Sequence, residues 1–318
     1  MQGGNDPSAA PRRKEQIMYV ITGVTGNIGS QVADILLARG DKVRVIGRNA
    51  DSLRRFVDRG AEAAVGNLKD SAFLTRAFSG ATAVFAMIPP DYTAQDFRAY
   101  QNEVGTSIAT AIRNTWTTYV VNLSSQGADL PAGTGPITGL HDQEERLNRL
   151  NGVNVLHLRC TYFMENLLMN IPLIKEKGFA ASAVRPDQKF AMIATRDIAT
   201  VVAKHLVKRD FRGKSLRDLL GQRDLSLSEA FSIIGREIGR PELNYVQLDY
   251  EEAARDYREM GISADVSRSF IEMNKALNEG RFAVKRPRTA NNSTPTSIEE
   301  FATIFAETYR APGRQKAA

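Results

Sequence analysis

Three glycines that follow an apolar run constrain this chain more than any other feature. The apolar run covers residues 17–21, the glycines are Gly23, Gly26 and Gly29, and an amphipathic run covers residues 28–39. This order predicts a strand, a tight turn and a helix, because glycine permits sharp backbone angles and lets a helix lie close to a strand. The N–H groups and positive dipole end of the helix would then face a pyrophosphate. The turn therefore predicts a nucleotide-binding site.

The spacing of the turn is Gly-x-x-Gly-x-x-Gly, which differs from the Gly-x-Gly-x-x-Gly spacing of many dehydrogenases. The alternative to nucleotide binding is a purely structural glycine turn. A strand before the turn and a helix after it favour binding, since this is the context that the motif requires. The cofactor contacts expected from the turn are Gly23, Thr25, Gly26, Asn27, Ile28 and Gly29.

Short apolar runs alternate with helical patterns up to about residue 160. The remaining strands are expected at residues 42–46, 61–65, 82–88, 118–123 and 153–158, and helices at 51–58, 71–78, 96–113 and 140–150. Such alternation implies right-handed crossovers and a parallel sheet that helices cover on both faces. We therefore predict the α/β class: a doubly wound parallel sheet of Rossmann type, forming a dinucleotide-binding domain over residues 17–160.

Residues 161–318 are predicted to form a smaller, mostly helical substrate lobe, with some elements returning to the Rossmann sheet. Helical patterns cover residues 166–177, 197–208, 226–238, 250–259, 265–278 and 298–309, and short strands are expected at 190–193 and 243–247. Residues 1–16 have no periodic pattern, which predicts a flexible tail.

Composition narrows the class of protein. The net charge is +6, but residues 281–318 hold seven basic and three acidic side chains, and residues 17–280 carry only +1. A basic stripe for nucleic acid is therefore not expected. No apolar run approaches the length of about 20 residues that a membrane helix needs. The single cysteine, Cys160, excludes an internal disulfide and predicts a cytoplasmic protein. Both a monomer and a homodimer fit the sequence.

The end of the second strand indicates which nicotinamide cofactor fits. An NAD site usually carries a carboxylate there for the ribose hydroxyls. Here the strand ends in Gly47, Arg48 and Asn49, and the first carboxylate is Asp51. A guanidinium can hold a 2′-phosphate through two hydrogen bonds, so Arg48 predicts NADPH. The alternative is that Arg48 is a solvated residue at the start of the next helix.

Further cofactor contacts are expected at the ends of the later strands. Asn67 and Leu68 follow the third strand, where Asn67 either binds the adenine amine or shapes the turn. Met87 and Ile88 end the fourth strand, just before a stiff Pro-Pro loop. Tyr162 follows the sixth strand and either lines the nicotinamide pocket or packs between the lobes.

These residues together resemble the NmrA-like atypical short-chain dehydrogenases, and in particular the branch of NADPH-dependent quinone, azo-dye and triphenylmethane-dye reductases. The resemblance runs from about residue 17 to the last helix and is carried by the glycine turn, Gly47-Arg48, Gly66-Asn67-Leu68 and the block over residues 158–166. Two positions depart from it, because the family more often has Asp at the place of Asn67 and Pro at that of Cys160.

A typical short-chain dehydrogenase has a serine at the end of its fifth strand and a Tyr-x-x-x-Lys pair in the next helix. The resemblance places Ser124 at the serine position, but His141 stands at the tyrosine position and Glu145 at the lysine position. The usual proton donor is therefore absent. His141 either donates a proton near neutral pH or forms a structural polar pair with Glu145. A metal bound by this pair is not expected, because no third ligand is evident.

The missing acid narrows the predicted chemistry. Reduction of a ketone needs a nearby acid, whereas a quinone gives a stabilised phenolate and a cationic dye gives a neutral product. We therefore predict an NADPH-dependent oxidoreductase that transfers a hydride to a small quinone-like or cationic aromatic acceptor. A regulator that binds NADP and senses redox state without catalysis fits the same residues. Epimerisation of a sugar nucleotide is disfavoured by the same missing pair.

Overall fold

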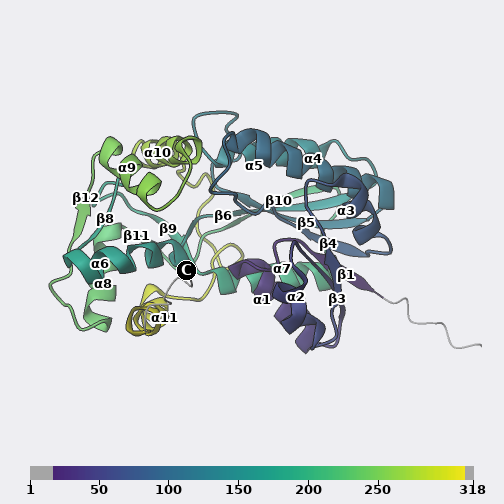
Figure 1. Cartoon of the computed structure of the whole chain (residues 1–318), viewed down its shortest axis with the longest axis horizontal. Coiled ribbons are helices and arrows are strands. Elements are labelled where there is room, and N and C mark those ends of the chain that lie inside the picture. The colour runs from purple at the N-terminus through teal and green to yellow at the C-terminus, as the bar shows by residue number, and fades with distance from the viewer. Residues whose placement is uncertain (1–16, 312–318) are drawn as a thin grey trace, which may run out of the picture.

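The computed structural model describes residues 17–311, and it has two lobes (Figure 1). The tail predicted for residues 1–16 lies outside the described residues. The larger lobe is built on a sheet of seven strands, all paired in parallel, in the order β10-β6-β5-β4-β1-β2-β3. The strands are β1 (Met18–Ile21), β2 (Lys42–Gly47), β3 (Glu62–Val65), β4 (Ala83–Ala86), β5 (Tyr119–Ser125), β6 (Asn154–Cys160) and β10 (Lys214–Leu219). This is the predicted doubly wound order.

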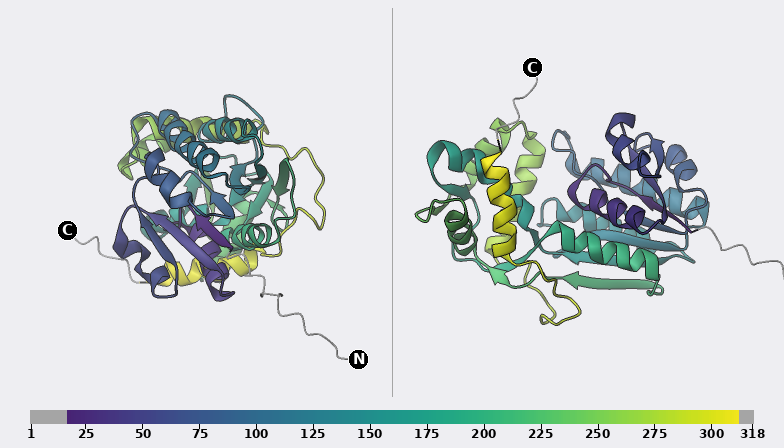
Figure 2. Two further views of the ribbon diagram at one scale, coloured as in Figure 1. Left: turned by 90° about the vertical axis from the view of Figure 1, so that its right-hand side faces the viewer. Right: turned by 90° about the horizontal axis from the view of Figure 1, so that it is seen from below.

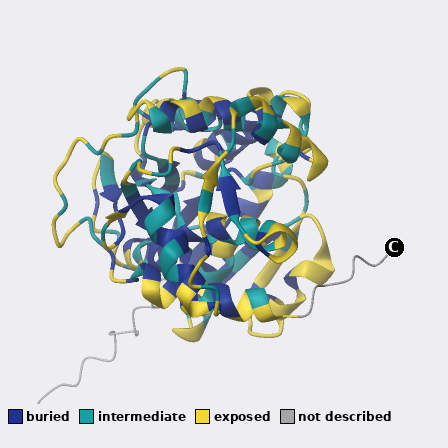
Figure 3. Ribbon diagram, turned by 90° about the vertical axis from the view of Figure 1, so that its left-hand side faces the viewer, coloured by how far each residue is buried: buried dark blue, intermediate teal, exposed yellow. Residues whose placement is uncertain are grey.

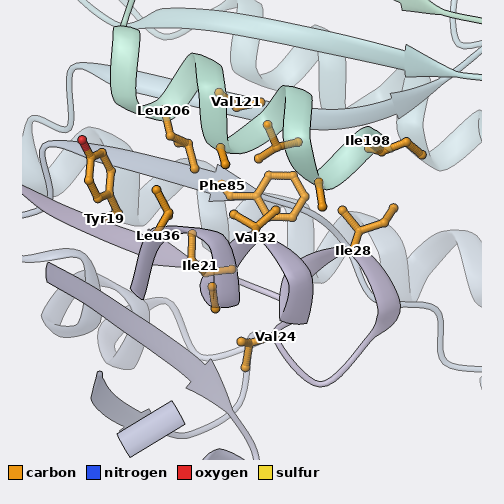
Figure 4. Close-up of a cluster of buried hydrophobic side chains, with 14 of the residues drawn as sticks. Tyr19, Ile21, Val24, Ile28, Val32, Leu36, Phe85, Val121, Ile198 and Leu206 are labelled. Atoms are coloured by element: carbon orange, nitrogen blue, oxygen red, sulfur yellow. The ribbon is translucent and has the colours of Figure 1, made fainter. Parts of the chain in front are cut away.

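Helices cover both faces of this sheet, and strands such as β1 and β4 are buried on both sides (Figure 1). One face carries α1 (Asn27–Ala38), α2 (Ala50–Val57) and α7 (Thr195–Lys208), and the other carries α3 (Ser71–Phe78), α4 (Phe97–Thr115) and α5 (Ile137–Asn148). In β1, Ile21 packs against the first group, whereas Val20 packs against the second. Figure 4 shows Ile21, Phe85 and Val32 meeting between β1, β4 and α1.

The smaller lobe has its own apolar core, centred on Phe231, Phe301 and Phe305. Its strands form two small sheets: β11 (Asp224–Leu225), β9 (Phe190–Ile193) and β7 (Tyr162–Phe163) form one, and β12 (Tyr245–Gln247) and β8 (Ala180–Ser182) form the other. Its helices are η1 (Met164–Asn170), α6 (Ile171–Lys177), α8 (Leu227–Glu237), α9 (Tyr250–Glu259), α10 (Ala264–Asn278) and α11 (Ile298–Arg310). Buried residues concentrate inside the molecule and exposed ones line its outer helices and loops (Figure 3).

Two neighbouring residues of β7 join the two cores. Tyr162 packs into the core of the small lobe, whereas Phe163 packs against the core of the large lobe. Just beyond them, the Glu165 carboxylate accepts hydrogen bonds from the backbone N–H and the hydroxyl of Thr195, at 2.9 and 2.6 Å. Glu165 therefore caps α7, whose N-cap residue, Ala194, offers no side-chain acceptor.

Several elements differ from the prediction. The strand β10 was not predicted, because the sequence Lys-Ser-Leu-Arg-Asp-Leu lacks a continuous apolar run; it lies at the edge of the sheet, where polar residues are tolerated. The short strands β7, β8 and β11 were also missed. Ser124 and Ser125 belong to β5 itself, and α5 begins at Ile137, three residues before the predicted start. Within the described residues, no helix is both long and apolar enough to cross a membrane.

Candidate functional site

The glycine turn lies at the carboxyl end of β1, the central strand at which the chain's crossovers change direction. Gly23 has φ +65°, and a Cβ added to it would lie 2.3 Å from the Met87 sulfur. A Cβ on Gly29 would lie 2.3 Å from the carbonyl oxygen of Gly23. A Cβ on Gly26 would meet nothing closer than 3.5 Å. Gly23 and Gly29 are therefore required by the fold, whereas Gly26 leaves space open at the surface.

Thr22 fixes the turn to the neighbouring strand, a role that the sequence analysis did not assign. Its buried hydroxyl accepts a hydrogen bond from the Met87 N–H at 2.8 Å and lies 3.1 Å from the carbonyl oxygens of Phe85 and Met87. The carboxyl ends of β1 and β4 are thereby held in register, with Met87 half-buried over Gly23 and Ile88 9% exposed.

The first turn of α1 has free backbone donors. Gly26 is its N-cap and provides no side-chain hydrogen bond, and no acidic residue lies in the first turn. Thr25, Gly26 and Asn27 are exposed, whereas the side chain of Ile28 belongs to the core. Exposed N–H groups and the positive end of the helix dipole suit an anion. The residues present therefore fit the pyrophosphate of a dinucleotide.

Arg48 is exposed directly after β2, and no hydrogen bond or ion pair of its side chain is found among the described residues. The next residue, Asn49, caps α2 by accepting a hydrogen bond from the N–H of Asp51 at 2.8 Å. The guanidinium is nevertheless close enough to Asp91 to help lower the pKa of that carboxyl, although hydrogen bonds from Thr93 contribute most. Arg48 is therefore available to bind a phosphate, while Asn49 starts the helix.

Asn67 shapes the turn after β3. Its side-chain oxygen accepts a hydrogen bond from the N–H of Lys69 at 3.0 Å, which fixes the amide group in the turn. Leu68 is half-buried against the core between the sheet and α3. Tyr162 packs on Phe190, with ring centroids 5.1 Å apart, and burial raises the pKa of its phenol. These contacts show how the turn and the ring are held in the fold; a role of either in binding a cofactor stays a prediction.

His141 and Glu145 face a pocket of about 330 Å³ between α5 and the β6–β10 edge of the sheet. The Nδ1–H of His141 donates to the carbonyl oxygen of Ala128 at 2.9 Å, since a carbonyl can only accept. No hydrogen bond joins His141 to Glu145 among the described residues, so this carbonyl orients the ring. None of the residues predicted to contact the cofactor lines the pocket.

Ser124 does not line this pocket; it lies under α5 and is 2% exposed. Its hydroxyl donates to Glu144, which in turn forms two hydrogen bonds with Arg159, at 2.9 and 2.6 Å. Burial alone would lower the pKa of Arg159, but the Glu144 carboxylate beside it raises that pKa above its ordinary value. This charged pair joins α5 to β5 and β6. This ion pair was not predicted from the sequence, although an arginine near the end of a buried strand indicates that a buried acidic partner lies nearby.

His157 is also part of this buried polar layer. Its ring nitrogens lie 3.2 Å from the Asn122 amide and 3.0 Å from the Asn148 oxygen, and burial lowers its pKa to about 4. Cys160 is buried, and its thiol pKa is raised by burial, which excludes a reactive thiolate. The described residues contain no group of three His, Cys, Asp or Glu side chains placed to hold a metal ion.

The fold and the open glycine turn define a protein of the Rossmann dinucleotide-binding class. The NmrA-like family matches residues 14–302, which is most of the sequence, and the chain belongs to this family. The family predicted from the sequence is thus confirmed.

The relatives have related activities. An NAD(P)H azoreductase from Xenophilus azovorans is 27% identical over 260 residues, which cover 80% of this chain and 86% of the relative. The NADPH complex of the quinone oxidoreductase QOR2 from Escherichia coli superposes with a TM-score of 0.76 at 18% identity, covering 91% of this chain and 99% of that one. The NADP(H) complex of the Citrobacter triphenylmethane reductase gives 0.77 at 16% identity, with the same coverage. Both confirm the predicted fold.

The glycine geometry predicts losses of stability of different size for two substitutions. Gly29→Ala should lower the free energy of unfolding by roughly 1–3 kcal/mol or more, because its Cβ meets the Gly23 carbonyl. Gly26→Ala should cost less than about 1 kcal/mol, since only a helix N-cap is altered. Urea denaturation of the two variants measures the difference. Equal losses of stability would contradict the assignment.

His157 predicts a pH dependence of stability. Its pKa in the folded chain is about 4, against 6.5 ordinarily, so the unfolded chain binds the proton first as the pH falls. The stabilisation from neutral His157 is complete above about pH 6.5 and is lost as the pH drops toward 4, by roughly 3 kcal/mol in total. Urea midpoints measured at about pH 7.5 and 4.5 should therefore differ less for His157→Gln than for the parent. Equal pH dependence in both would refute this.

Proposed function

We propose that this protein is an NADPH-dependent reductase of quinone-like or cationic aromatic acceptors. The observation that carries the proposal is the open first turn of α1, with its unpaired N–H groups, together with Arg48 at the end of the adjacent strand β2. The two lie at the same edge of the sheet, because β1 and β2 are parallel neighbours. The activities of the azoreductase, quinone oxidoreductase and triphenylmethane reductase support the same class of reaction.

Each part of this edge has a distinct task in the proposal. The turn over residues 23–29 would hold the pyrophosphate through backbone N–H groups, and Arg48 would hold the 2′-phosphate. Met87 and Ile88 would line the cofactor beside the turn, and the peptide groups of Asn67 and Leu68 would border the adenine. When bound, NADPH supplies the hydride. The protein contributes orientation, which can supply a large part of a rate enhancement.

The class of acceptor follows from the hydrogen bonds that Ser124 and His141 already donate within the protein. The Ser124 hydroxyl donates its hydrogen bond to Glu144, and the Nδ1–H of His141 donates to the Ala128 carbonyl. Both donors are thus engaged within the protein, and neither is free to give a proton to a developing alkoxide. Quinones and cationic dyes do not need one, because their reduced forms are stabilised phenolates or neutral molecules.

A second candidate is a redox-sensing regulator that binds NADP without turnover. It is favoured by the location of His141 and Glu145, which line a pocket apart from the glycine turn. The two candidates share the cofactor site and differ only in whether an acceptor is reduced.

The role of Arg48 predicts selectivity between the two nicotinamide cofactors. Arg48→Ala should weaken NADPH binding by roughly 10- to 100-fold, the worth of a charge-assisted hydrogen bond, and leave NADH binding nearly unchanged. Arg54→Ala is the matched control, because Arg54 is an exposed arginine on the nearby helix α2. Fluorescence titration measures both affinities. A parallel loss for NADPH and NADH would show that Arg48 does not read the 2′-phosphate.

Steady-state NADPH oxidation tests the reductase directly. Quinones, azo dyes and triphenylmethane dyes should support turnover, whereas simple ketones should not. His141→Ala should retain activity within about threefold, since a general acid would contribute 100-fold or more. NADPH binding without turnover on any acceptor would overturn the reductase and leave the sensor. A loss of 100-fold or more in His141→Ala would instead make His141 the proton donor.

A further inference from the structure

The connection between α10 and α11 carries much of the basic excess of residues 281–318, including Lys285, Arg286 and Arg288. We call residues 281–292 the strap; it is part of the yellow loop that leads into α11 (Figure 2). Its basic side chains are paired rather than free. Lys285 pairs with Asp129, Arg286 with Asp218 at 3.3 Å, and Arg288 with Asp224. The acidic partners lie in the loop after β5, in β10 and in β11, so the strap contacts both lobes.

The strap also contacts the loop over residues 126–136, which connects β5 to α5. The ring of Phe282 lies against Gly127, where a Cβ would approach it to 2.6 Å. The guanidinium of Arg281 donates to the carbonyl oxygens of Gly133 and Ala132, at 2.9 and 3.2 Å. The loop is thus held by one apolar contact, two backbone carbonyls and the Lys285–Asp129 ion pair.

A chain of charged contacts extends from this loop into the sheet. Asp129 lies 3.6 Å from Arg159 as well as pairing with Lys285. Arg159 holds Glu144, which accepts a hydrogen bond from the Ser124 hydroxyl. The backbone of Gln126 also donates to the carbonyl oxygen of Cys160, at the end of β6. Movement of the strap would therefore displace groups at the carboxyl ends of β5 and β6.

We infer that Phe282 and Lys285 are positioning residues, which hold the 126–136 loop as one wall of the acceptor site. This rests on the proposed function, because the loop follows β5 at the edge of the sheet where doubly wound proteins bind their ligands. Among the described residues, no hydrogen bond or ion pair joins the strap to a residue proposed to bind the cofactor. Loosening the contact between the strap and the loop should weaken acceptor binding and leave NADPH binding intact.

The test compares Phe282→Ala and Lys285→Ala with the conservative variants Phe282→Leu and Lys285→Arg. Lys189→Ala is the control, because it removes an exposed ion pair, with Glu229, in the small lobe. Hydrogen exchange of residues 126–136 should accelerate by about tenfold in Phe282→Ala and by roughly two- to fivefold in Lys285→Ala. The acceptor KM should rise by similar factors, with kcat and the NADPH dissociation constant within about twofold of the parent.

The exchange measurement needs no turnover, so it separates this inference from the proposed function. Faster exchange in the loop for the two alanine variants, with recovery in the conservative ones, supports the positioning role. Unchanged exchange, or an equal change in Lys189→Ala, would overturn it. If exchange accelerates but neither the parent nor any variant reduces an acceptor, the contact between the strap and the loop is supported. The role of the loop as a wall of the acceptor site is then refuted, and the proposed reductase activity is refuted with it.

Discussion

The contact between Gly29 and the Gly23 carbonyl sets the geometry on which the rest of the site depends. Helix α1 lies so close to the end of β1 that no side chain fits between them. This approach leaves the first N–H groups of the helix at the surface, next to the end of β2. Thr22 adds the second constraint by joining β1 to β4 through its hydroxyl. One helix–strand contact and one side-chain bridge therefore fix α1, β1 and β4 relative to one another at the proposed cofactor edge.

The opposite half of the same edge is organised by charge. Glu144 and Arg159 fix α5 over β5 and β6, and Asp129 extends this network to the strap from the distant α10–α11 connection. Buried ion pairs add little net stability, but removal of one partner is costly because a buried charge is left unpaired. Such a network suits the precise placement of helix and loop. It also engages the Ser124 proton, which a typical short-chain dehydrogenase would offer to its substrate.

The sequence predicted the parts of the structure that strong periodicity determines. The first six strands, the doubly wound parallel sheet and the glycine turn follow from apolar runs and glycine spacing, which are local signals. The strand β10 did not follow, because an edge strand needs no continuous apolar run. Of the two alternatives for His141, the polar pair with Glu145 is not found among the described residues, because the Nδ1–H donates instead to the Ala128 carbonyl, 13 residues away in the sequence. The pairing of Lys285 with Asp129 joins residues far apart in the chain, and no local pattern encodes it.

A crystal structure of the protein with NADPH tests the central claim most directly. We expect the pyrophosphate to lie against the N–H groups at the start of α1 and the 2′-phosphate to lie within hydrogen-bond distance of Arg48. The nicotinamide should then lie toward β5, near the 126–136 loop. A cofactor bound instead in the pocket between α5 and β10, beside His141, would refute the assignment of the glycine turn and Arg48 as the cofactor site.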